Sequence, residues 1–398
     1  MTAVQSITIL GSTGSIGAST LDVIARNAGR FRVFALTANN NVDQLAKQCR
    51  RFSPKFAVMQ DAEAAARLKS SLADTDTRVL AGSDGLEEVA THEEVDCVMA
   101  AIVGGIGLAP TYAAVRAGKK VLLANKEALV MAGSLFMQAV AESGCVLLPI
   151  DSEHNAMFQC LPVNAVGRFE NEDGGGFARI VLTGSGGPFL HSDPARLAEV
   201  TPAQACAHPN WQMGQKISVD SATMVNKALE LIEACFLFGL PESAIEIMIH
   251  PQSIVHSMVQ YRDGSVLAQM GNPDMRTPIS YCLAWPERID AGVPALDLAT
   301  IARLDFQVPD LARFPCLKLG REAIKTGGSA PVILNAANEL AVAGFLAGAV
   351  RFDRIPAIIA ATLDGQPVTG MATLEEVLAA DAQARDTAAR IIRKITGE

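Results

Sequence analysis

The chain has 398 residues, of which 49% are hydrophobic, and its formal net charge is -9 at pH 7. This length suffices for two or three globular domains with buried cores. The acidic balance and the lack of a long Lys/Arg-rich run argue against a partner that is nucleic acid.

The apolar segments predict buried elements rather than membrane spans. The most hydrophobic long window, residues 330–350, carries Asn335, Asn338 and Glu339 near its middle, which a bilayer would penalise. No basic segment precedes an apolar stretch at the N-terminus, so we expect a first strand there and no secretion signal. The eight cysteines show no CxxC pair and no metal-like spacing, which predicts reduced thiols and a cytoplasmic location.

Apolar β-type runs alternate with amphipathic helical stretches over the first 150 residues. The intervening stretches repeat apolar residues at intervals of three and four, as helices with one buried face do. The runs predict seven strands, at residues 7–10, 32–38, 56–59, 78–82, 96–104, 120–125 and 145–151. This βαβ alternation predicts an α/β fold whose first domain, residues 1–150, is a Rossmann-like parallel sheet covered by helices.

The first predicted strand ends in a glycine-rich turn, Gly11-Ser-Thr-Gly14-Ser-Ile-Gly17, and a helical stretch follows it. Such a turn can cradle a pyrophosphate against a helix N-terminus, and the hydroxyl groups of Ser12, Thr13 and Ser15 add donors. The spacing is one residue off the usual G-x-G-x-x-G, so a tight turn without a ligand stays open as an alternative.

The second predicted strand is followed by Asn39, Asn40 and Asn41, where an NAD site usually has an acid for the ribose 2′-hydroxyl. The nearest acid is Asp43. This pattern favours a cofactor that carries a 2′-phosphate.

Two further predicted strands end in polar groups, at Lys126-Glu127 and at residues 151–155. Ligands of open α/β sheets bind outside the carboxyl ends of strands, so reactive groups are expected here. Asp151 and Glu153 point to the same side if the chain is still extended. A solvated loop is the alternative.

The pattern changes after residue 151. An acidic, glycine-rich stretch at 167–176 predicts a surface insertion, and Asp263-Gly264 predicts a hairpin whose open sheet edge suits dimerisation. We expect residues 151–311 to form an α+β catalytic and dimerisation domain. Residues 312–398 are Ala-rich and predict a structural helical domain.

A helix is predicted near Ser221, with Asp220 or Ser221 as its cap. Asn226, Glu230 and Glu233 lie at helical spacing on it, with Lys227 alongside. An ordinary outward-facing polar stripe explains this spacing equally well. Together, however, Asp151, Glu153 and Glu230 would make an all-oxygen site suited to Mg²⁺ or Mn²⁺.

The stretches 183–189 and 207–216 are rich in glycine, proline and small polar residues. They predict a loop that closes over a ligand, with Trp211 and Met213 as apolar contacts. His208 taken alone is more often a structural histidine.

Eight segments, in order and spanning nearly the whole chain, resemble the 1-deoxy-D-xylulose 5-phosphate reductoisomerase family. The segments are GSTGSIG (11–17), LLANKEALV (122–130), DSEHNA (151–156), LTGSGGPF (182–189), the block at 208–234, HPQSIVHS (250–257), GNPDMRTPI (271–279) and LNAANELAVAGFL (334–346). The resemblance implies a cytoplasmic homodimer of the non-mevalonate isoprenoid pathway. It would rearrange 1-deoxy-D-xylulose 5-phosphate and reduce it with NADPH to 2-C-methyl-D-erythritol 4-phosphate. A divalent cation, Mg²⁺ or Mn²⁺ with Co²⁺ as a further option, and inhibitors of the fosmidomycin type, which are phosphonate-hydroxamates, are also implied.

The resemblance also implies roles for single residues. The metal ion falls to Asp151, Glu153 and Glu230, and the catalytic roles fall to Lys126, Ser152, Glu153 and His208. Substrate contacts are implied for Ser152, Ser185, His208, Trp211, Met213, Ser221, Asn226 and Lys227, with Ser221 at a helix N-terminus beside the phosphate and His256 as a weaker candidate. Cofactor contacts are implied for Gly11, Ser12, Thr13, Gly14, Ser15, Ile16, Gly17, Ala38, Asn39, Asn40, Asn41, Asn125 and Glu127.

The chain departs from the family pattern in one place that bears on the cofactor. The family commonly has Gly-Lys-Asn where this chain has Asn39-Asn40-Asn41, so the lysine expected against the 2′-phosphate is missing. The acidic stretch near 170–176 is a second difference, without an expected role in the mechanism.

Two alternatives from other functional classes stay open. One is another Rossmann-type NADP-dependent dehydrogenase acting on a small phosphorylated or amino-acid-pathway substrate, which would turn over without metal. The other is a non-catalytic dinucleotide sensor, which would have no use for Asp151, Glu153 and Glu230 together.

Overall fold

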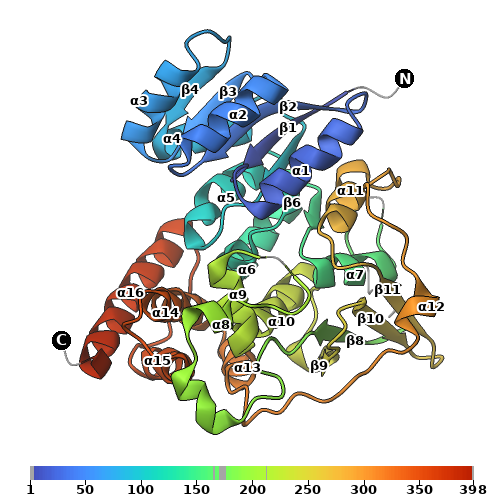
Figure 1. Cartoon of the computed structure of the whole chain (residues 1–398), viewed down its shortest axis with the longest axis vertical. Helices are drawn as coiled ribbons and strands as arrows, with labels where there is room; N and C mark the ends of the chain where they lie inside the picture. Colours follow the sequence, from blue (N-terminus) through green and yellow to red (C-terminus); the bar gives the residue numbers. More distant parts are fainter. Residues whose placement is uncertain (1–3, 165, 170–175, 212, 397–398) are drawn as a thin grey trace. The chain divides into compact units, whose positions relative to one another are not determined.

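The structure is a computed structural model that describes residues 4–164, 166–169, 176–211 and 213–396 (Figure 1). The chain forms two compact units, each built from separate stretches of sequence. The first unit comprises residues 1–128, 136–155 and 274–294, and the second comprises residues 129–135, 156–273 and 295–398. The expected division after residues 150 and 311 stays a prediction, and residues 312–398 fall in the second unit with the stretch 156–273.

The first unit contains a seven-stranded sheet in which every pairing is parallel. Its strands are β1 (Gln5–Leu10), β2 (Phe31–Ala38), β3 (Phe56–Met59), β4 (Arg78–Ala81), β5 (Cys97–Ala100), β6 (Lys120–Leu123) and β7 (Leu147–Pro149). All seven predicted strands are therefore confirmed. Those predicted after β4 run past the observed carboxyl ends, because the chain turns there into loops that carry polar groups and glycines.

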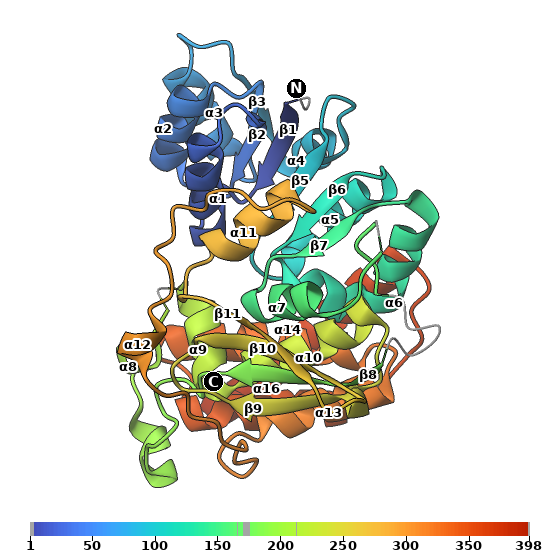
Figure 2. The ribbon, with the colours of Figure 1, turned by 90° about the vertical axis from the view of Figure 1, so that its right-hand side faces the viewer.

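Helices connect these strands, as the predicted βαβ alternation requires. They are α1 (Ser15–Arg26), α2 (Val42–Phe52), α3 (Ala62–Ser71), α4 (Gly82–Thr91), η1 (Gly105–Gly107), α5 (Leu108–Arg116) and α6 (Lys126–Ser143), with α7 (Ser152–Cys160) after the last strand. A later helix, α11 (Arg276–Ala284), returns to the first unit and packs against α1 (Figure 2). Strands β3 and β5 are buried along their whole length, as expected for a parallel sheet covered on both faces.

The strand order β4-β3-β2-β1-β5-β6-β7 reverses direction at β1. The chain builds outward from β1 to β4 and then crosses to the other side of β1. In open α/β sheets, ligands bind outside the carboxyl ends of the strands at such a reversal, here those of β1 and β5.

The second unit contains a four-stranded mixed sheet in the order β11-β10-β8-β9. Its strands are β8 (Phe177–Gly184), β9 (Ile245–Ile249), β10 (Val255–Tyr261) and β11 (Val266–Met270). The hairpin predicted around Asp263-Gly264 is confirmed, since it joins β10 to β11, with Gly264 at a φ of 88°. β11 lies at an edge of this sheet, and Val266 and Leu267 on it are exposed.

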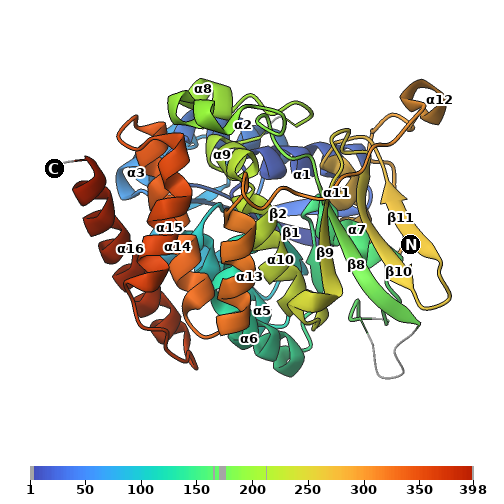
Figure 3. The same cartoon turned by 90° about the horizontal axis from the view of Figure 1, so that it is seen from below.

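Helices make up most of the remainder of the second unit. They are η2 (Pro194–Glu199), α8 (Pro202–Ala205), α9 (Gln215–Thr223), α10 (Val225–Phe238), η3 (Glu242–Ala244), α12 (Leu298–Ile301), α13 (Cys316–Thr326), α14 (Ala330–Leu346), η4 (Phe352–Arg354), α15 (Ile355–Asp364) and α16 (Leu374–Thr396). Apolar side chains from α9, α10 and α13 to α16 share one core, and Figure 3 shows α10, α13 and α14 side by side. The predicted helical character of residues 312–398 is confirmed.

The hydrophobic window at 330–350 forms the buried helix α14, as predicted. Asn335 and Asn338 on it are fully buried. Among the described residues, no helix has the length and apolar character needed to cross a bilayer.

Candidate active site

The glycine-rich turn joins β1 to α1, and each of its three glycines has a different surrounding. Gly11 has a φ of 83°, and a Cβ there would lie 2.6 Å from the carbonyl oxygen of Ala101. A Cβ on Gly17 would lie 2.4 Å from Cα of Ser12, so only glycine fits at either position. A Cβ on Gly14 would meet only the Gly11 oxygen, at 3.5 Å. The turn therefore leaves room for a ligand to approach the backbone beside Gly14.

The backbone N–H groups in the first turn of α1 lie next to the open space beside Gly14. Gly14 is the N-cap residue and supplies no side-chain cap, so the first-turn N–H groups of Ser15, Ile16 and Gly17 have no side-chain acceptor from that position. These donors and the positive end of the helix dipole suit a pyrophosphate. Thr13 and Ser15 lie on the accessible side of the turn.

Ser12 differs from the expectation of a hydroxyl donor for a ligand. It is fully buried, and its hydroxyl donates to Oε1 of Gln48 at 2.7 Å. The Gln48 amide donates back to the Ser12 carbonyl at 2.8 Å, and the Ser12 N–H donates to the Thr37 carbonyl at 2.8 Å. These bonds use the polar groups of Ser12 to tie the turn to α2 and β2.

The three asparagines follow the carboxyl end of β2, which ends at the buried Ala38. All three asparagines are exposed, and Asn41 also caps α2 by accepting a hydrogen bond from the Gln44 N–H at 3.2 Å. Asn41 therefore has a structural role that the sequence pattern did not reveal. Arg32, the nearest cation on this strand, lies at its opposite end and faces Glu94.

Asn125 and Glu127 follow β6 and are buried. The Asn125 amide donates to the carbonyls of Ile102 and Gly104, at 2.6 and 3.0 Å, and to Glu127 at 3.2 Å. These bonds fix the loop after β5 to the end of β6. Both strands thus contribute to one rigid rim at the carboxyl edge of the sheet.

Lys126 and Asp151 come from neighbouring strand ends and form an ion pair. Lys126 is 6% exposed, at the start of α6. Burial raises the pKa of Asp151, but the charges of Lys126 and His154 and the hydrogen bonds to the carboxylate outweigh burial and hold that pKa well below its ordinary value. Asp151 is therefore an anion at neutral pH.

Ser152 and Glu153 begin α7, and the Ser152 hydroxyl donates to Oε2 of Glu153 at 2.6 Å. The condition under which Asp151 and Glu153 were expected to share one side, an extended chain, is not met, although oxygen atoms of the two carboxylates lie within 4.8 Å of each other. The strand ends at Pro149, and the chain is helical from Ser152. A period of two therefore does not apply to these carboxylates.

In the second unit, Ser185 and His208 form a hydrogen-bonded pair, with Oγ of Ser185 2.9 Å from Nε2 of His208. Nδ1 of His208 accepts from the N–H groups of Asn210 and Trp211, at 3.2 and 3.0 Å. The neutral ring must therefore carry its proton on Nε2 and donate it to Ser185. Because the Ser185 oxygen also accepts from the Gly187 N–H at 3.1 Å, its own proton remains available for another acceptor.

The loop at residues 208–214 rests on the segment 250–256 of the same unit. The Asn210 amide donates to the Pro251 carbonyl at 2.6 Å and to the Ser253 hydroxyl at 3.1 Å. The rings of Trp211 and His256 lie 6.0 Å apart, and Met213 is half-buried. Trp211 and His256 are thus brought together, whereas residue 212 lies outside the described part of the chain.

Asn226, Lys227 and Glu230 lie on the first two turns of α10, where the Asn226 amide and the Lys227 ammonium both donate to the Glu230 carboxylate. Lys227 is 4% exposed and Glu230 is 1% exposed. The alternative of an outward-facing polar stripe is therefore wrong. A Cβ on Gly184, at the end of β8, would lie 2.8 Å from Cε of Lys227, so that glycine makes room for the lysine stem.

The expected helix cap at Asp220 or Ser221 is also wrong. Helix α9 begins at Gln215 and runs through both residues to Thr223, and Met224, at a φ of 62°, separates it from α10. Ser221 therefore lies in the last turn of α9 and not at a helix N-terminus. The Ser221 carbonyl oxygen is nevertheless close to Gly187, since a Cβ on that glycine would lie 2.8 Å from it. Gly187 in turn donates its N–H to the Ser185 oxygen, so it links the two serines.

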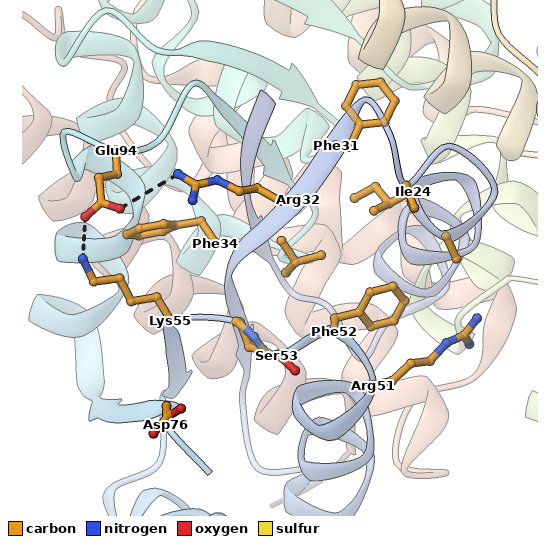
Figure 4. Close-up of a pocket in the computed structure, with 14 residues that line it drawn as sticks. Ile24, Phe31, Arg32, Phe34, Arg51, Phe52, Ser53, Lys55, Asp76 and Glu94 are labelled. Atoms are coloured by element: carbon orange, nitrogen blue, oxygen red, sulfur yellow. Dashed lines mark hydrogen bonds and ion pairs between the residues drawn. The ribbon is translucent and has the colours of Figure 1, made fainter. Parts of the chain in front are cut away.

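A cavity of about 480 Å³ lies elsewhere in the first unit, beside the amino end of β2 (Figure 4). Phe31, Phe34 and Phe52 line it, and Glu94 pairs there with Lys55 and Arg32. None of the predicted site residues is among those that line it. The cavity is thus separate from the glycine-rich turn, which lies at the carboxyl ends of the strands.

Three family models match the chain along most of its length. They are 1-deoxy-D-xylulose 5-phosphate reductoisomerase at residues 7–133, a C-terminal domain of the same enzyme at 147–238, and the DXP reductoisomerase C-terminal domain at 270–387. Relatives with that enzyme name include one from Cellvibrio japonicus, 59% identical over 98% of this chain and 99% of its own length. Another, from Pseudomonas savastanoi pv. phaseolicola, is 61% identical over 97% of each chain.

Solved structures agree with these matches. The Zymomonas mobilis enzyme in complex with NADPH is 49% identical, with a TM-score of 0.90 over 98% of this chain and 99% of that chain. A DOX-P reductoisomerase in complex with NADPH, fosmidomycin and magnesium is 46% identical, with a TM-score of 0.94 over the same shares. Because the three family models cover most of the chain and its relatives are about 60% identical over nearly their full length, this chain belongs to the 1-deoxy-D-xylulose 5-phosphate reductoisomerase family.

Proposed function

We propose that the chain converts 1-deoxy-D-xylulose 5-phosphate to 2-C-methyl-D-erythritol 4-phosphate by rearrangement and NADPH-dependent reduction. The observation that carries this proposal is the pairing of a buried lysine with a carboxylate within each unit, Lys126 with Asp151 and Lys227 with Glu230. Buried charges are costly, and buried, paired titratable groups are enriched at functional sites. Full-length relatives that carry this enzyme name support the same activity.

We propose that NADPH binds at the carboxyl edge of the parallel sheet. The room beside Gly14 and the backbone donors of Ser15, Ile16 and Gly17 fit its pyrophosphate. Asn39 and Asn40 directly follow β2, where folds of this type contact the ribose 2′ group. Neither side chain carries a negative charge that would repel a 2′-phosphate. Ser12, Asn41, Asn125 and Glu127 shape this edge through their internal hydrogen bonds. When bound, NADPH supplies the hydride for the reduction.

We propose Asp151, Glu153 and Glu230 as the ligands of a divalent cation, Mg²⁺ or Mn²⁺. Carboxylate oxygens are the donors that these hard cations prefer, and Asp151 is ionised at neutral pH because its pKa is lowered. The cation, when bound, stabilises the negative charge that develops on the substrate oxygens during the rearrangement. The solved relative with magnesium and fosmidomycin supports this assignment and points to the same class of inhibitor.

The remaining polar groups suit the substrate chain and its phosphate. The Ser185 hydroxyl keeps its proton because its oxygen already accepts from His208 and Gly187, so it can donate to a phosphate oxygen. Asn226 and Lys227 supply further donors, and Lys126 and Ser152 can donate to the reacting oxygens. Trp211 and Met213 supply apolar cover that would exclude water during hydride transfer.

We further propose that the enzyme is a cytoplasmic homodimer. The eight cysteines are all thiols, which suits a reducing compartment. Among the described residues, β11 is an edge strand with Val266 and Leu267 47% and 50% exposed, and such edges are otherwise prone to uncontrolled pairing. Leu267→Lys should therefore yield monomers in sedimentation experiments, and an unchanged dimer would place the interface elsewhere.

The test of the proposed activity is NADPH oxidation with 1-deoxy-D-xylulose 5-phosphate, with and without EDTA, followed by identification of the product. We expect turnover that EDTA abolishes and added Mg²⁺ restores. Turnover of another substrate without metal would favour the dehydrogenase alternative. NADPH binding without turnover of this substrate would favour the sensor.

A further inference from the structure

A buried polar contact joins α9 to α14, the helix that the sequence indicated to be structural only. The Asn338 amide donates to Oδ1 of Asp220 at 2.9 Å, and Nζ of Lys216 lies 2.8 Å from Oδ2 of the same carboxylate. Asn338 is 0% exposed and Asp220 is 1% exposed. Each carboxylate oxygen of Asp220 therefore has its own partner, one of them from a helix far away in the sequence.

The surroundings of this contact are apolar. Val219 and Ala222 of α9 belong to the same core as Leu334, Ala337 and Ala341 of α14. Small apolar side chains decide which faces of two helices meet, but they specify the position along the helix axis weakly. A buried carboxylate is costly unless its partners are in place, so a single such contact can select one register.

The contact between Asp220 and Asn338 lies close in the sequence to several predicted substrate residues, so it can hold them in place. Lys216 belongs to the first turn of α9, directly after the loop at residues 208–214, and Ser221 follows Asp220. Three residues further on, Met224 adopts a φ of 62°, which is costly for a side chain of this size and persists only where the surroundings hold it. The Asp220 carbonyl contributes to that joint by accepting from the Thr223 hydroxyl at 3.2 Å.

We propose that Asp220 and Asn338 are positioning residues for the substrate site. They lock the register of α9 on α14, and through Lys216 and the joint at Met224 they hold the loop at 208–214, Ser221 and the start of α10 in the binding geometry. This inference rests on the proposed function, because it takes those elements as the ones that contact 1-deoxy-D-xylulose 5-phosphate. It gives the C-terminal helices a part in catalysis without placing any of their residues in contact with substrate.

The test compares two asparagines of α14. Asn338→Leu removes the donor to Asp220, and Asn335→Leu is the matched control, because Asn335 is equally buried but its amide donates to Glu339 on its own helix. We expect Asn338→Leu to lower kcat/KM for 1-deoxy-D-xylulose 5-phosphate on the order of tenfold or more, with KM for NADPH within about twofold of wild type. We expect Asn335→Leu to lower the melting temperature comparably while leaving both kinetic parameters near wild type.

A second measurement reads the loop directly. Hydrogen exchange of the amides of His208, Asn210, Trp211, Met213 and Gly214 should be faster in Asn338→Leu than in Asn335→Leu or wild type, without any ligand. If Asn338→Leu does not fold, Asp220→Asn, which keeps the shape and removes the charge that Lys216 faces, should show the same two effects.

Equal kinetic losses in the two leucine variants, or wild-type kinetics in Asn338→Leu, would overturn the inference. If the wild-type chain itself fails to turn over 1-deoxy-D-xylulose 5-phosphate, the proposed function fails. The exchange experiment then still decides whether Asn338 holds the loop, since it needs neither substrate nor activity.

Discussion

Ser12, Asn41 and Asn125 stand in sequence segments that indicate cofactor contact, yet each forms hydrogen bonds within the first unit. Ser12 bonds with Gln48, Asn41 caps α2, and Asn125 holds the loop after β5. A motif therefore encodes the shape of a binding edge as well as the groups that touch the ligand. Asn39, Asn40 and Asn41 are all exposed, but the side-chain oxygen of Asn41 is used as a cap, so Asn39 and Asn40 are the first candidates to meet a 2′-phosphate.

This residue-level picture makes cofactor preference testable at position 40. Asn40→Lys should tighten NADPH binding by about fivefold, on the order of 1 kcal/mol, because it adds a charge-assisted contact to the 2′-phosphate. NADH binding should hardly change. The gain should shrink at high salt, since an exposed contact is screened. Steady-state kinetics with both cofactors at two salt concentrations measure this.

The neighbouring exposed residue supplies the control for that change. Asn39→Lys adds the same charge one position earlier and should gain less if position 40 faces the phosphate. An equal effect of Asn40→Lys on NADH and NADPH would contradict the assignment. Arg32 could not then take over the role, because it lies at the opposite end of β2 and faces Glu94.

Metal dependence is also decided at a single residue. Glu230→Gln keeps the side-chain shape, but its single carbonyl oxygen can accept from only one of Asn226 and Lys227, which now bind different carboxylate oxygens, and it removes one ligand charge. We expect activity to fall by at least about 100-fold and the Mg²⁺ concentration needed for half-maximal activity to rise. The melting temperature should also fall, because the buried Lys227 loses its counter-charge. Glu230→Asp, which keeps the charge, should recover part of the loss. Near-wild-type turnover of Glu230→Gln at low metal would remove Glu230 from the metal site.

At the level of elements, the loop at residues 208–214 links the substrate groups of the second unit. It begins at His208, which faces Ser185, and it ends at the first turn of α9. Between them, Trp211 lies beside His256 with its ring half-buried. A ligand that draws this loop inward must change the surroundings of the indole.

Intrinsic fluorescence tests this movement, because Trp211 is one of only two tryptophans. Binding of a phosphonate-hydroxamate should change the emission of the wild-type protein, and Trp211→Phe should remove most of that change. Trp285→Phe, which replaces the other tryptophan, should preserve it. If the signal persists in Trp211→Phe and is lost in Trp285→Phe, Trp211 does not cover the ligand.

Elements differed in how far the sequence could predict them. All seven strands of the parallel sheet were predictable, because continuous apolar runs between polar turns indicate buried strands. The edge strand β4 is the exception, since it has such a run but is only partly buried. The start of α9 was not predictable, since Asp220 and Ser221 have the residue types of a helix cap while the partner of Asp220 is Asn338, 118 positions away. The burial of Lys227 and Glu230 was equally hidden, because helical spacing does not show that two charges neutralise each other inside the fold.

At the level of the whole molecule, the two units do not follow the order of the sequence. Residues 274–294 return to the first unit, where α11 packs against α1, and the chain then re-enters the second unit. Composition changes mark where patterns switch, but they cannot show that a later segment packs against an earlier one. The stability of the second unit consequently depends on long-range contacts, and one of them carries a titratable group.

That group is His250, which is fully buried and stacks on the Phe306 ring with centroids 4.6 Å apart. Nε2 accepts from the Ile254 N–H at 3.1 Å, so Nδ1 carries the proton and donates to the Asp305 carbonyl at 2.8 Å. Burial lowers the pKa of this imidazole below its ordinary value, and the bond to Asp305 and the charge of Asp305 oppose that shift only in part. A second proton on the ring would bind to Nε2, which would then be a donor facing another donor, the Ile254 N–H.

The sign of the resulting pH dependence follows from which state binds the proton more readily. In the unfolded chain His250 takes up a proton near its ordinary pKa of about 6.5, whereas the folded state resists it. The stability from neutral His250 is therefore present above that pH and is lost as the pH falls toward the folded pKa. Between about pH 7.5 and about pH 5.5, the thermal unfolding midpoint of the wild-type protein should drop, and His250→Gln should drop less although it is less stable at neutral pH. His191→Gln, a change at an exposed histidine, should keep the wild-type slope. Equal slopes in His250→Gln and wild type would show that other groups carry the pH dependence.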